Sequence, residues 1–424
     1  MRSANLEIHV VRVSPKGNSP ALQRWGLRPE YRLGPCGRKN PLPSLAELMI
    51  TADILHPGLE RLGYCRSVRS VELLIQDVAF GGKGVARDQG KAVFVPFTID
   101  GERVTAKIVR EKKQFAEAES LELLEPSSHR VAPECPYFGR CGGCSYQHIA
   151  YEHQLELKTR QVEQAMRRIG RLSEPPMQPI IPSPLPYGYR NRITVHAEDG
   201  VVGFYRRDVH QLMDIARCPI AAPEVNDALA QLRAGRVRDG HYTLRAHSGP
   251  RVFAQTNDAV AEALANLIAG ILPPEAKLLI DAFCGAGFFT KRLAPRFERA
   301  VGIDWDRFAI KAAQKDAGAN EAYVGGDVTT ELRWLLEQSD RMATALIVDP
   351  PATGLSAEIR SAILDAPPRM MIYVSCNPPT LARDLAELQK RFSVLSITPF
   401  DMFPQTAEIE VLVHLQIRNV AALA

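Results

Sequence analysis

The sequence predicts a multi-domain protein with an N-terminal OB-like β-barrel, a central α+β domain and a C-terminal α/β domain. Three patterns predict this: short alternating strands between glycine turns, a cysteine group in the middle, and a strand–helix rhythm from about residue 256. A length of 424 residues also favours several domains, since single cores rarely exceed ~250 residues. The expected boundaries are residues 71–127, 128–255 and 256–424, preceded by a poorly ordered extension over residues 1–70.

The composition is that of an ordinary globular protein. Hydrophobic residues make up 46% and charged residues 24%, which excludes extended disorder or collagen-like repeats for most of the chain. No run approaches the ~18 apolar residues that span a bilayer. No secretory leader is recognisable, so we expect a cytoplasmic protein without membrane contact. We also expect a monomer.

Positive charge is concentrated near the N-terminus. The formal charge is +4, yet residues 1–70 carry 11 Lys and Arg against 5 Asp and Glu, whereas the remainder carries 41 against 43. This balance permits a nucleic-acid binder without indicating one. Binding by the rest of the chain would need local basic patches, such as residues 103–113 and 190–192.

The segment 71–127 contains about five short alternating strands. Turns at residues 81–84, 88–90 and 100–101 separate them, which predicts a small closed barrel. Such barrels commonly bind nucleic acid. The alternative is a barrel that only packs against its neighbour.

The central segment is defined by its cysteines. Cys135, Cys141 and Cys144 lie close together in the sequence, and Cys218 lies far downstream. Four thiolates suit either tetrahedral zinc or an iron–sulfur cluster, and the spacing leaves both open. A helix is expected over residues 146–171, and prolines over residues 175–186 indicate a linker.

The C-terminal segment carries acids at successive strand ends. Asp281 ends a predicted strand, and Gly285 and Gly287 form the turn into a helix, where free N–H groups can meet a ligand. Asp304 is placed to bind a ribose diol and Asp327 to meet an adenine edge. This order favours an S-adenosylmethionine site, because the turn lacks the third glycine of a dinucleotide site.

Two further motifs concern the reaction. Asp349 lies in Val-Asp-Pro-Pro, and Ala352 follows where enzymes that methylate amines carry an aromatic residue. Methylation of an exocyclic amine is therefore disfavoured. Cys376, in Ser-Cys-Asn-Pro after a buried strand, is predicted to be a nucleophile. Cys284, inside the glycine turn, is predicted to be structural.

A nucleophilic cysteine beside this cofactor has a use in pyrimidine methylation. C5 of a pyrimidine is a weak nucleophile, and addition of a thiolate at C6 raises its electron density. A base must then remove the C5 proton. Glu408 and Glu410 share one face of a predicted strand and are both candidates; the alternative is a solvated strand end.

Taken together, the motifs resemble the RNA uracil-5-methyltransferase family. Cys-x5-Cys-Gly-Gly-Cys, Asp-Ala-Phe-Cys-Gly-Ala-Gly-Phe, Asp-Pro-Pro, Ser-Cys-Asn-Pro and Asp-Met-Phe-Pro-Gln-Thr occur in order within residues 71–424. The resemblance implies formation of 5-methyluridine in RNA by a Rossmann-like methyltransferase domain. It also implies that the barrel is a TRAM domain, as in the ribosomal branch, so 23S rRNA is favoured over tRNA as the partner.

The resemblance also implies roles for individual residues. It implies that a [4Fe–4S] cluster is bound by Cys135, Cys141, Cys144 and Cys218, that Cys376 is the nucleophile and that Glu410 is the base. Phe253 and Gln255 match a Phe-x-Gln element, which implies stacking of a flipped-out uracil on Phe253 and cofactor binding by Gln255. Phe283 and Asp304 match cofactor positions, and Asp349 matches a position at both cofactor and substrate.

The chain departs from the family pattern at three positions. Phe288 stands where many members have Asn, Ala352 replaces an Arg, and Glu408 replaces a common His. These departures bear on which RNA is the target more than on which reaction is catalysed. The alternatives are a tRNA uracil-5-methyltransferase, an RNA cytosine-5-methyltransferase with the same thiolate chemistry, and a non-catalytic RNA-binding paralogue.

Overall fold

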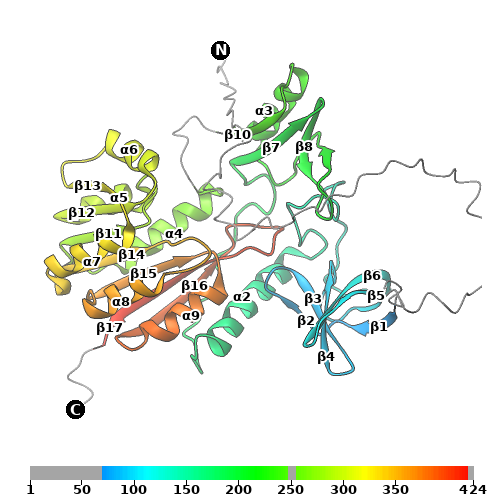
Figure 1. Ribbon diagram of the computed structural model, residues 1–424, viewed down its shortest axis with the longest axis horizontal. Coiled ribbons are helices and arrows are strands. Elements are labelled where there is room, and N and C mark those ends of the chain that lie inside the picture. The colour runs from blue at the N-terminus through cyan, green and yellow to red at the C-terminus, as the bar shows by residue number, and fades with distance from the viewer. Residues whose placement is uncertain (1–68, 247–254, 419–424) are drawn as a thin grey trace, which may run out of the picture.

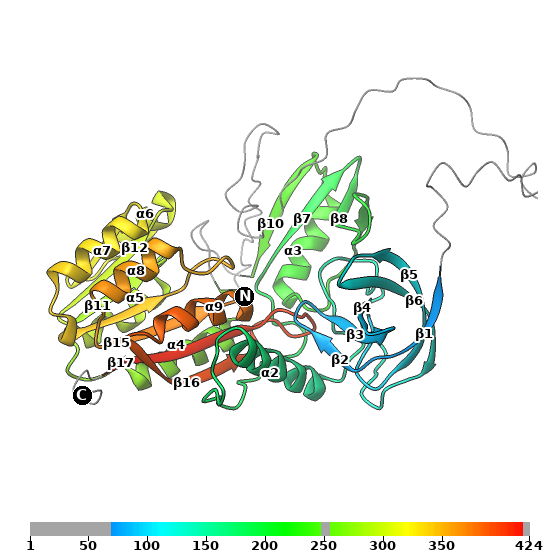
Figure 2. The same cartoon turned by 60° about the horizontal axis from the view of Figure 1, so that its bottom comes forward.

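The computed structural model describes residues 69–246 and 255–418 as three β-sheets with their helices, laid out along the molecule (Figure 1; Figure 2). Phe253 and nearly all of the predicted basic extension lie outside the described residues. Over these two ranges, no helix is long and apolar enough to cross a membrane.

The N-terminal sheet has six strands rather than about five, in the order β1-β5-β6-β4-β3-β2. Three register shifts between β5 and β6 bend the sheet, as bulges do. Alternate side chains such as Val104 and Ala106 fill its interior. The strands are β1 (Ser70–Leu74), β2 (Asp77–Ala79), β3 (Lys83–Asp88), β4 (Lys91–Pro96), β5 (Arg103–Glu111) and β6 (Phe115–Glu125).

The two arginines in the basic run along β5 are paired with acids of the same sheet. Arg103 forms ion pairs with Glu72 and Glu125, and Arg110 lies 3.7 Å from Glu117. Because these charges are partly neutralised, the run offers less to an RNA backbone than its sequence suggests.

The central part combines a long helix with a small sheet. The helix α2 (Tyr151–Arg168) is shorter at both ends than the expected 146–171. The sheet has the order β10-β7-β8-β9 and packs against α3. Its elements are β7 (Arg192–Glu198), β8 (Val201–Tyr205), β9 (Leu212–Asp214), α3 (Pro223–Ala234) and β10 (Gly240–Arg245).

The C-terminal sheet has seven strands in the order β13-β12-β11-β14-β15-β17-β16. The first five run parallel, whereas β17 is antiparallel to both of its neighbours. Ligands of such sheets lie beyond the carboxyl ends of the strands. The strands are β11 (Leu278–Ala282), β12 (Arg299–Asp304), β13 (Glu321–Gly325), β14 (Thr344–Val348), β15 (Met370–Ser375), β16 (Phe392–Phe400) and β17 (Glu410–Ile417).

Helices cover both faces of this sheet. One apolar cluster joins α7, α8 and α9 to one face, together with Val162 and Met166 of α2. A second cluster joins α4 and α5 to the other face. The helices are α4 (Asp258–Ile271), α5 (Phe288–Leu293), α6 (Arg307–Lys315), α7 (Val328–Gln338), α8 (Ala357–Asp365) and α9 (Pro378–Leu388).

The proline-rich segment expected as a linker lies along strand β16. The N–H of Gln178 donates to Ile397 O at 2.8 Å, and the N–H of Ile181 donates to Pro399 O at 2.9 Å. Covering an exposed strand edge in this way protects it from pairing with other chains. The segment therefore connects the central part to the C-terminal sheet and also covers the edge of that sheet.

Candidate active site

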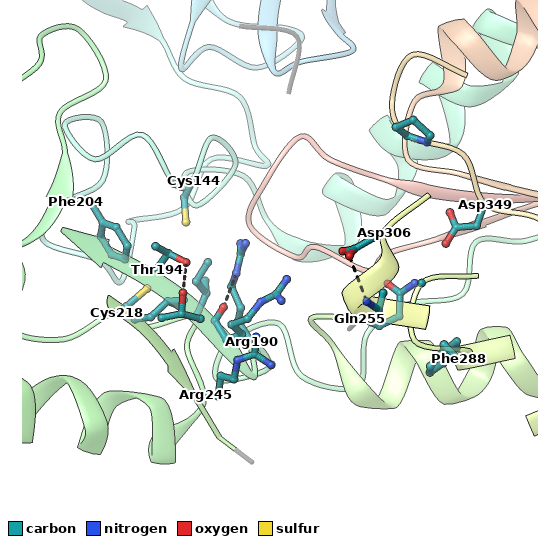
Figure 3. A pocket seen from close by; sticks show the side chains of 18 of the residues that line it. Cys144, Arg190, Thr194, Phe204, Cys218, Arg245, Gln255, Phe288, Asp306 and Asp349 are labelled. Carbon is teal, nitrogen blue, oxygen red and sulfur yellow. Dashed lines mark hydrogen bonds between the residues drawn. The ribbon is translucent and has the colours of Figure 1, made fainter. Parts of the chain in front are cut away.

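A cavity of about 1200 Å³ lies between the central sheet and the carboxyl ends of the C-terminal strands. This volume exceeds the usual size of a pocket for one small ligand, ~300–1,000 Å³. Figure 3 shows Cys144 and Cys218 on one side and Gln255, Phe288 and Asp349 on the other. The predicted site residues that line the cavity are Cys135, Cys141, Cys144, Cys218, Gln255, Phe283, Gly285, Asp304 and Asp349.

The glycine turn between β11 and α5 brings the backbone close to the cavity. Phe283 has a φ of +68°, a left-handed conformation that costs roughly 1–3 kcal/mol in a non-glycine residue. Gly287 has a φ of +83°, and a Cβ there would lie 2.7 Å from the hydroxyl of Tyr323. A side chain at position 287 would therefore both strain the turn and displace Tyr323.

Asp304 is held in place by the turn that it faces. One of its carboxylate oxygens accepts the N–H of Gly285 and the other accepts that of Asp306, both at 2.8 Å. The side chain is buried, yet it lines the cavity at the end of β12. A carboxylate oriented in this way suits a ligand that carries hydroxyl groups, as expected for a ribose.

Asp281 lies beneath the turn and does not line the cavity. One of its oxygens accepts the N–H and the hydroxyl of Thr290, at 3.0 and 2.6 Å. Burial raises the pKa of its carboxyl to about 7, the Thr290 hydrogen bonds lower it, and the charges of Asp349 and Asp304 raise it. Asp304 and Asp349, which line the cavity, give it a negative character that suits a cationic cofactor.

Asp327 is also outside the cavity lining. It is the N-cap of α7, where its exposed carboxylate accepts the N–H of Thr330 at 2.9 Å. Contact with an adenine edge stays a prediction. Gly287, likewise, shapes the turn without lining the cavity.

Sequence reasoning did not anticipate two surfaces of this cavity. Trp305 and Phe308 line it beside Asp304 and are 57% and 82% exposed. A signal for Trp305 was present, because it directly follows a predicted site acid. The opposite wall carries four arginines from the central part, of which only the 190–192 segment was expected; these are Arg190, Arg192, Arg217 and Arg245.

Phe288 forms an apolar wall of the cavity. The guanidinium of Arg292 lies over its ring, 4.0 Å from the centroid. No side-chain polar group is available at this position to meet a cofactor. Ala352 contributes its carbonyl, which accepts the hydroxyl of Thr380 at 3.0 Å.

Cys376 and Glu410 lie at the same end of two antiparallel strands. Ser375 of β15 pairs with Val411 of β17, and Cys376 directly follows Ser375 whereas Glu410 directly precedes Val411. Cys376 is half-buried, immediately before Asn377, the N-cap of α9. The positive end of the helix dipole there favours a negative charge. Neither residue lines the cavity, but both lie at the strand edge where Asp349 does.

The four predicted metal-ligand cysteines face one part of the cavity. The carbonyl and N–H of Cys218 bond to the side chain of Asn226, and the Cys144 carbonyl accepts Arg207 at 2.7 Å. Burial raises the pKa of the Cys144 thiol to about 12 and that of Cys218 to about 11. Charge on Cys141 and Cys135 is a smaller cause of both raised pKa values.

These thiols fit an iron–sulfur cluster by their chemistry and by facing one cavity. In the described part of the chain, however, no three His, Cys, Asp or Glu side chains have the spacing of a metal-ion site. The predicted iron–sulfur centre therefore stays a prediction. Cys284, in contrast, packs with Ile310, Ala313 and Tyr323, and burial raises the pKa of its thiol.

Comparison with known proteins identifies the domains. Residues 67–121 match the TRAM domain, and residues 336–418 match the family described as tRNA (Uracil-5-)-methyltransferase. An RNA methyltransferase of Bdellovibrio bacteriovorus is 32% identical over 378 residues, which covers 82% of this chain and 95% of that protein. One of Protochlamydia amoebophila is 30% identical over 424 residues, covering 82% and 97%.

A solved structure shares the fold. The Pyrococcus abyssi tRNA (uracil-54, C5)-methyltransferase, in complex with S-adenosyl-L-homocysteine, superposes with a TM-score of 0.64 at 22% identity. The match covers 81% of this chain and all of that one. Fold and site thus define an S-adenosylmethionine-dependent methyltransferase with a TRAM domain. The chain belongs to the RNA uracil-5-methyltransferase family. The predicted TRAM barrel and Rossmann-like catalytic fold are confirmed.

The raised pKa of Asp281 predicts a pH-dependent stability. Its folded pKa of about 7 lies above the ordinary value of 3.8, so between these pH values the folded state binds more protons. Its contribution to the free energy of unfolding therefore decreases as pH rises from about 4 to 7. We expect Asp281→Asn to flatten this decrease in a series of Tm measurements from pH 4 to 8. The exposed Asp227→Asn is the control, and an unchanged slope in Asp281→Asn would exclude this origin.

Proposed function

We propose that the chain methylates C5 of a uridine in RNA, with Cys376 as nucleophile and Glu410 as base. The observation that carries the proposal is the pairing of Ser375 with Val411, because these are the chain neighbours of Cys376 and Glu410 at one end of the strand pair. Their position beside Asp349, at the edge where a cofactor of this fold binds, supports the same conclusion.

The proposed reaction divides into steps that the residues can perform. The Cys376 thiolate adds to C6, forming a C–S bond and moving the electron pair of the double bond toward C5 and O4. S-Adenosylmethionine, when bound, supplies the methyl group that C5 accepts. Glu410 then takes the C5 proton, the electrons of that bond restore the C5–C6 double bond, and the thiolate leaves.

The cofactor is expected to contact residues of the cavity wall and its turn. Asp304 would receive the ribose hydroxyls, and Gln255, Phe283 and Asp349 would contact the rest of the cofactor, with Asp349 also close to the substrate. These residues come from four separate segments that line one cavity. Phe253 would stack on the flipped uracil.

The arginine wall supports RNA as the substrate. Arg190, Arg192, Arg217 and Arg245 line the cavity from the central part, and Figure 3 labels two of them. Arginine binds phosphate oxygens and stacks on bases, so it suits an unpaired strand that delivers a base into the site. We favour 23S rRNA over tRNA, because a TRAM barrel joined to a four-cysteine centre resembles the ribosomal branch of the family.

We further propose that Cys135, Cys141, Cys144 and Cys218 hold a [4Fe–4S] cluster. The soft sulfur donors and their shared position in the lining of one cavity support a bound metal centre. The cluster would join the segment of residues 135–144 to the distant turn at Cys218, which is a structural role.

The substrate and the nucleophile can be tested together. We expect total RNA from cells lacking the chain to lose 5-methyluridine at one 23S rRNA position, measured by nucleoside mass spectrometry and mapping. Cys376→Ser should not restore it and should form no covalent adduct with RNA containing 5-fluorouridine, although its RNA affinity stays within about twofold of wild type. Loss from tRNA, appearance of methylated cytosine as the product, or full restoration by Cys376→Ser would contradict the corresponding part of the proposal.

The choice between the two glutamates has its own test. Because the base acts after methyl transfer, Glu410→Gln should accumulate a methylated, denaturant-resistant adduct on ordinary uridine RNA. Its turnover should fall by about 10²–10⁴-fold. Glu408→Gln is the matched variant and should release product without accumulating the adduct. The opposite pattern would assign the base to Glu408.

The metal centre can be tested by measuring the iron, sulfide and zinc content of the purified protein. Anaerobically purified protein should contain iron and acid-labile sulfide with a broad visible absorption, and Cys141→Ser should contain much less of both. A stoichiometric amount of zinc, without sulfide, would overturn the iron–sulfur assignment in favour of a tetrahedral zinc site.

A further inference from the structure

The hairpin loop over residues 401–409, which leads from β16 into Glu410, is almost entirely buried. Asp401, Met402, Gln405 and Ile409 are each at most 3% exposed. Loops normally run over the surface, because water satisfies their backbone polar groups. A buried loop must instead find its hydrogen-bond partners inside the protein, and here helix α2 supplies several of them.

Gln154 of α2 pairs with Gln405 through both of its amide atoms. Its Nε2 donates to Gln405 Oε1, and its Oε1 accepts the backbone N–H of Gln405, each at 3.0 Å. Gln154 is fully buried. Gln405 has a φ of +68°, a conformation that costs roughly 1–3 kcal/mol in a non-glycine residue. The paired amides help to hold the loop in this conformation.

Lys158 lies one helical turn further along α2 and fixes the start of the same loop. Its Nζ donates to Asp401 Oδ1 at 2.5 Å and to Phe403 O at 3.0 Å. Both charged side chains are 0% exposed. A buried ion pair is often no more stabilising than apolar residues of similar volume, but removal of one partner leaves an uncompensated buried charge.

The segment that follows Cys144 anchors the loop from the other side. The N–H groups of Ser145 and Tyr146 donate to Gln405 O at 3.1 and 3.0 Å, and Ser145 Oγ accepts the N–H of Ala407 at 2.9 Å. The loop thus has anchors at Asp401, Gln405 and Ala407, the last of them three residues before Glu410.

We propose that Gln154 and Lys158 are positioning residues for Glu410. They hold the loop so that the carboxylate meets the C5 proton of the methylated adduct; this inference rests on the proposed function. Neither residue belongs to the cavity lining, so their effect on the reaction passes through the loop. A displacement of the base by about 1 Å is enough to slow proton removal about 10²-fold.

Two measurements, trapping of fluorinated RNA and turnover on uridine RNA, distinguish a positioning role from a general loss of folded protein. Trapping by 5-fluorouridine RNA needs thiolate addition and methyl transfer but no proton removal, whereas turnover on uridine RNA needs all three. We expect Gln154→Met to trap fluorinated RNA within about twofold of wild type. Its kcat on uridine RNA should fall about 10- to 100-fold with little change in KM, and the methylated adduct should accumulate.

The control lies on the same helix. Gln164 donates to Asp77 Oδ2 of the barrel at 3.0 Å, away from the loop, so Gln164→Met should leave trapping and turnover unchanged. Equal losses of trapping and turnover in Gln154→Met, or no loss in either, would overturn the positioning role. If wild-type protein fails to trap fluorinated RNA at all, the proposed function itself is wrong.

A second variant covers the case in which Gln154→Met does not fold. Lys158→Met with Asp401→Asn removes both buried charges while keeping side-chain volumes similar, so it avoids an unpaired buried charge. If Lys158 is a positioning residue, this double variant should also accumulate the methylated adduct on uridine RNA. It should still trap fluorinated RNA at the wild-type rate. Normal turnover in the folded double variant would exclude Lys158 as a positioning residue.

Discussion

The buried ion pair between Lys158 and Asp401 is the constraint on which the arrangement of the molecule depends. Lys158 belongs to α2, and the same helix bonds to the barrel, where Gln161 Nε2 donates to Val78 O at 2.8 Å. Val162 and Met166 of this helix complete the apolar core of the catalytic sheet. One helix therefore joins the TRAM barrel, the catalytic sheet and the loop before Glu410, and its polar contacts set how these parts meet.

The catalytic half was predictable because its signals are local. Strands and helices alternate from about residue 256, and ligands of an open parallel sheet bind beyond the carboxyl ends of its strands. Asp304, Asp349 and Cys376 could thus be assigned to one edge from the sequence alone. The glycine turn was also predicted from the sequence. The structure explains why glycine is needed there: Gly287 has a left-handed backbone conformation, and a Cβ at this position would meet Tyr323.

Other features depend on contacts between segments far apart in the sequence, which no local pattern encodes. The proline-rich segment does not look like a strand, yet it pairs with β16 through Gln178 and Ile181. The basic run of β5 cannot reveal that Arg103 is paired with Glu72 and Glu125. Likewise, polar residues on α2 would ordinarily indicate a solvated face, and only the fold shows them buried against the loop.

The separation of these partners along the chain has a consequence for biogenesis. Gln154 and Gln405 are 251 positions apart, Lys158 and Asp401 are 243 apart, and Ser145 and Ala407 are 262 apart. Domains form progressively as a chain leaves the ribosome, and long-range contacts close late. The barrel and α2 thus emerge well before β17, the strand that begins at Glu410. A nascent chain therefore cannot complete this buried loop until residues 401–409 have left the ribosome and can meet α2.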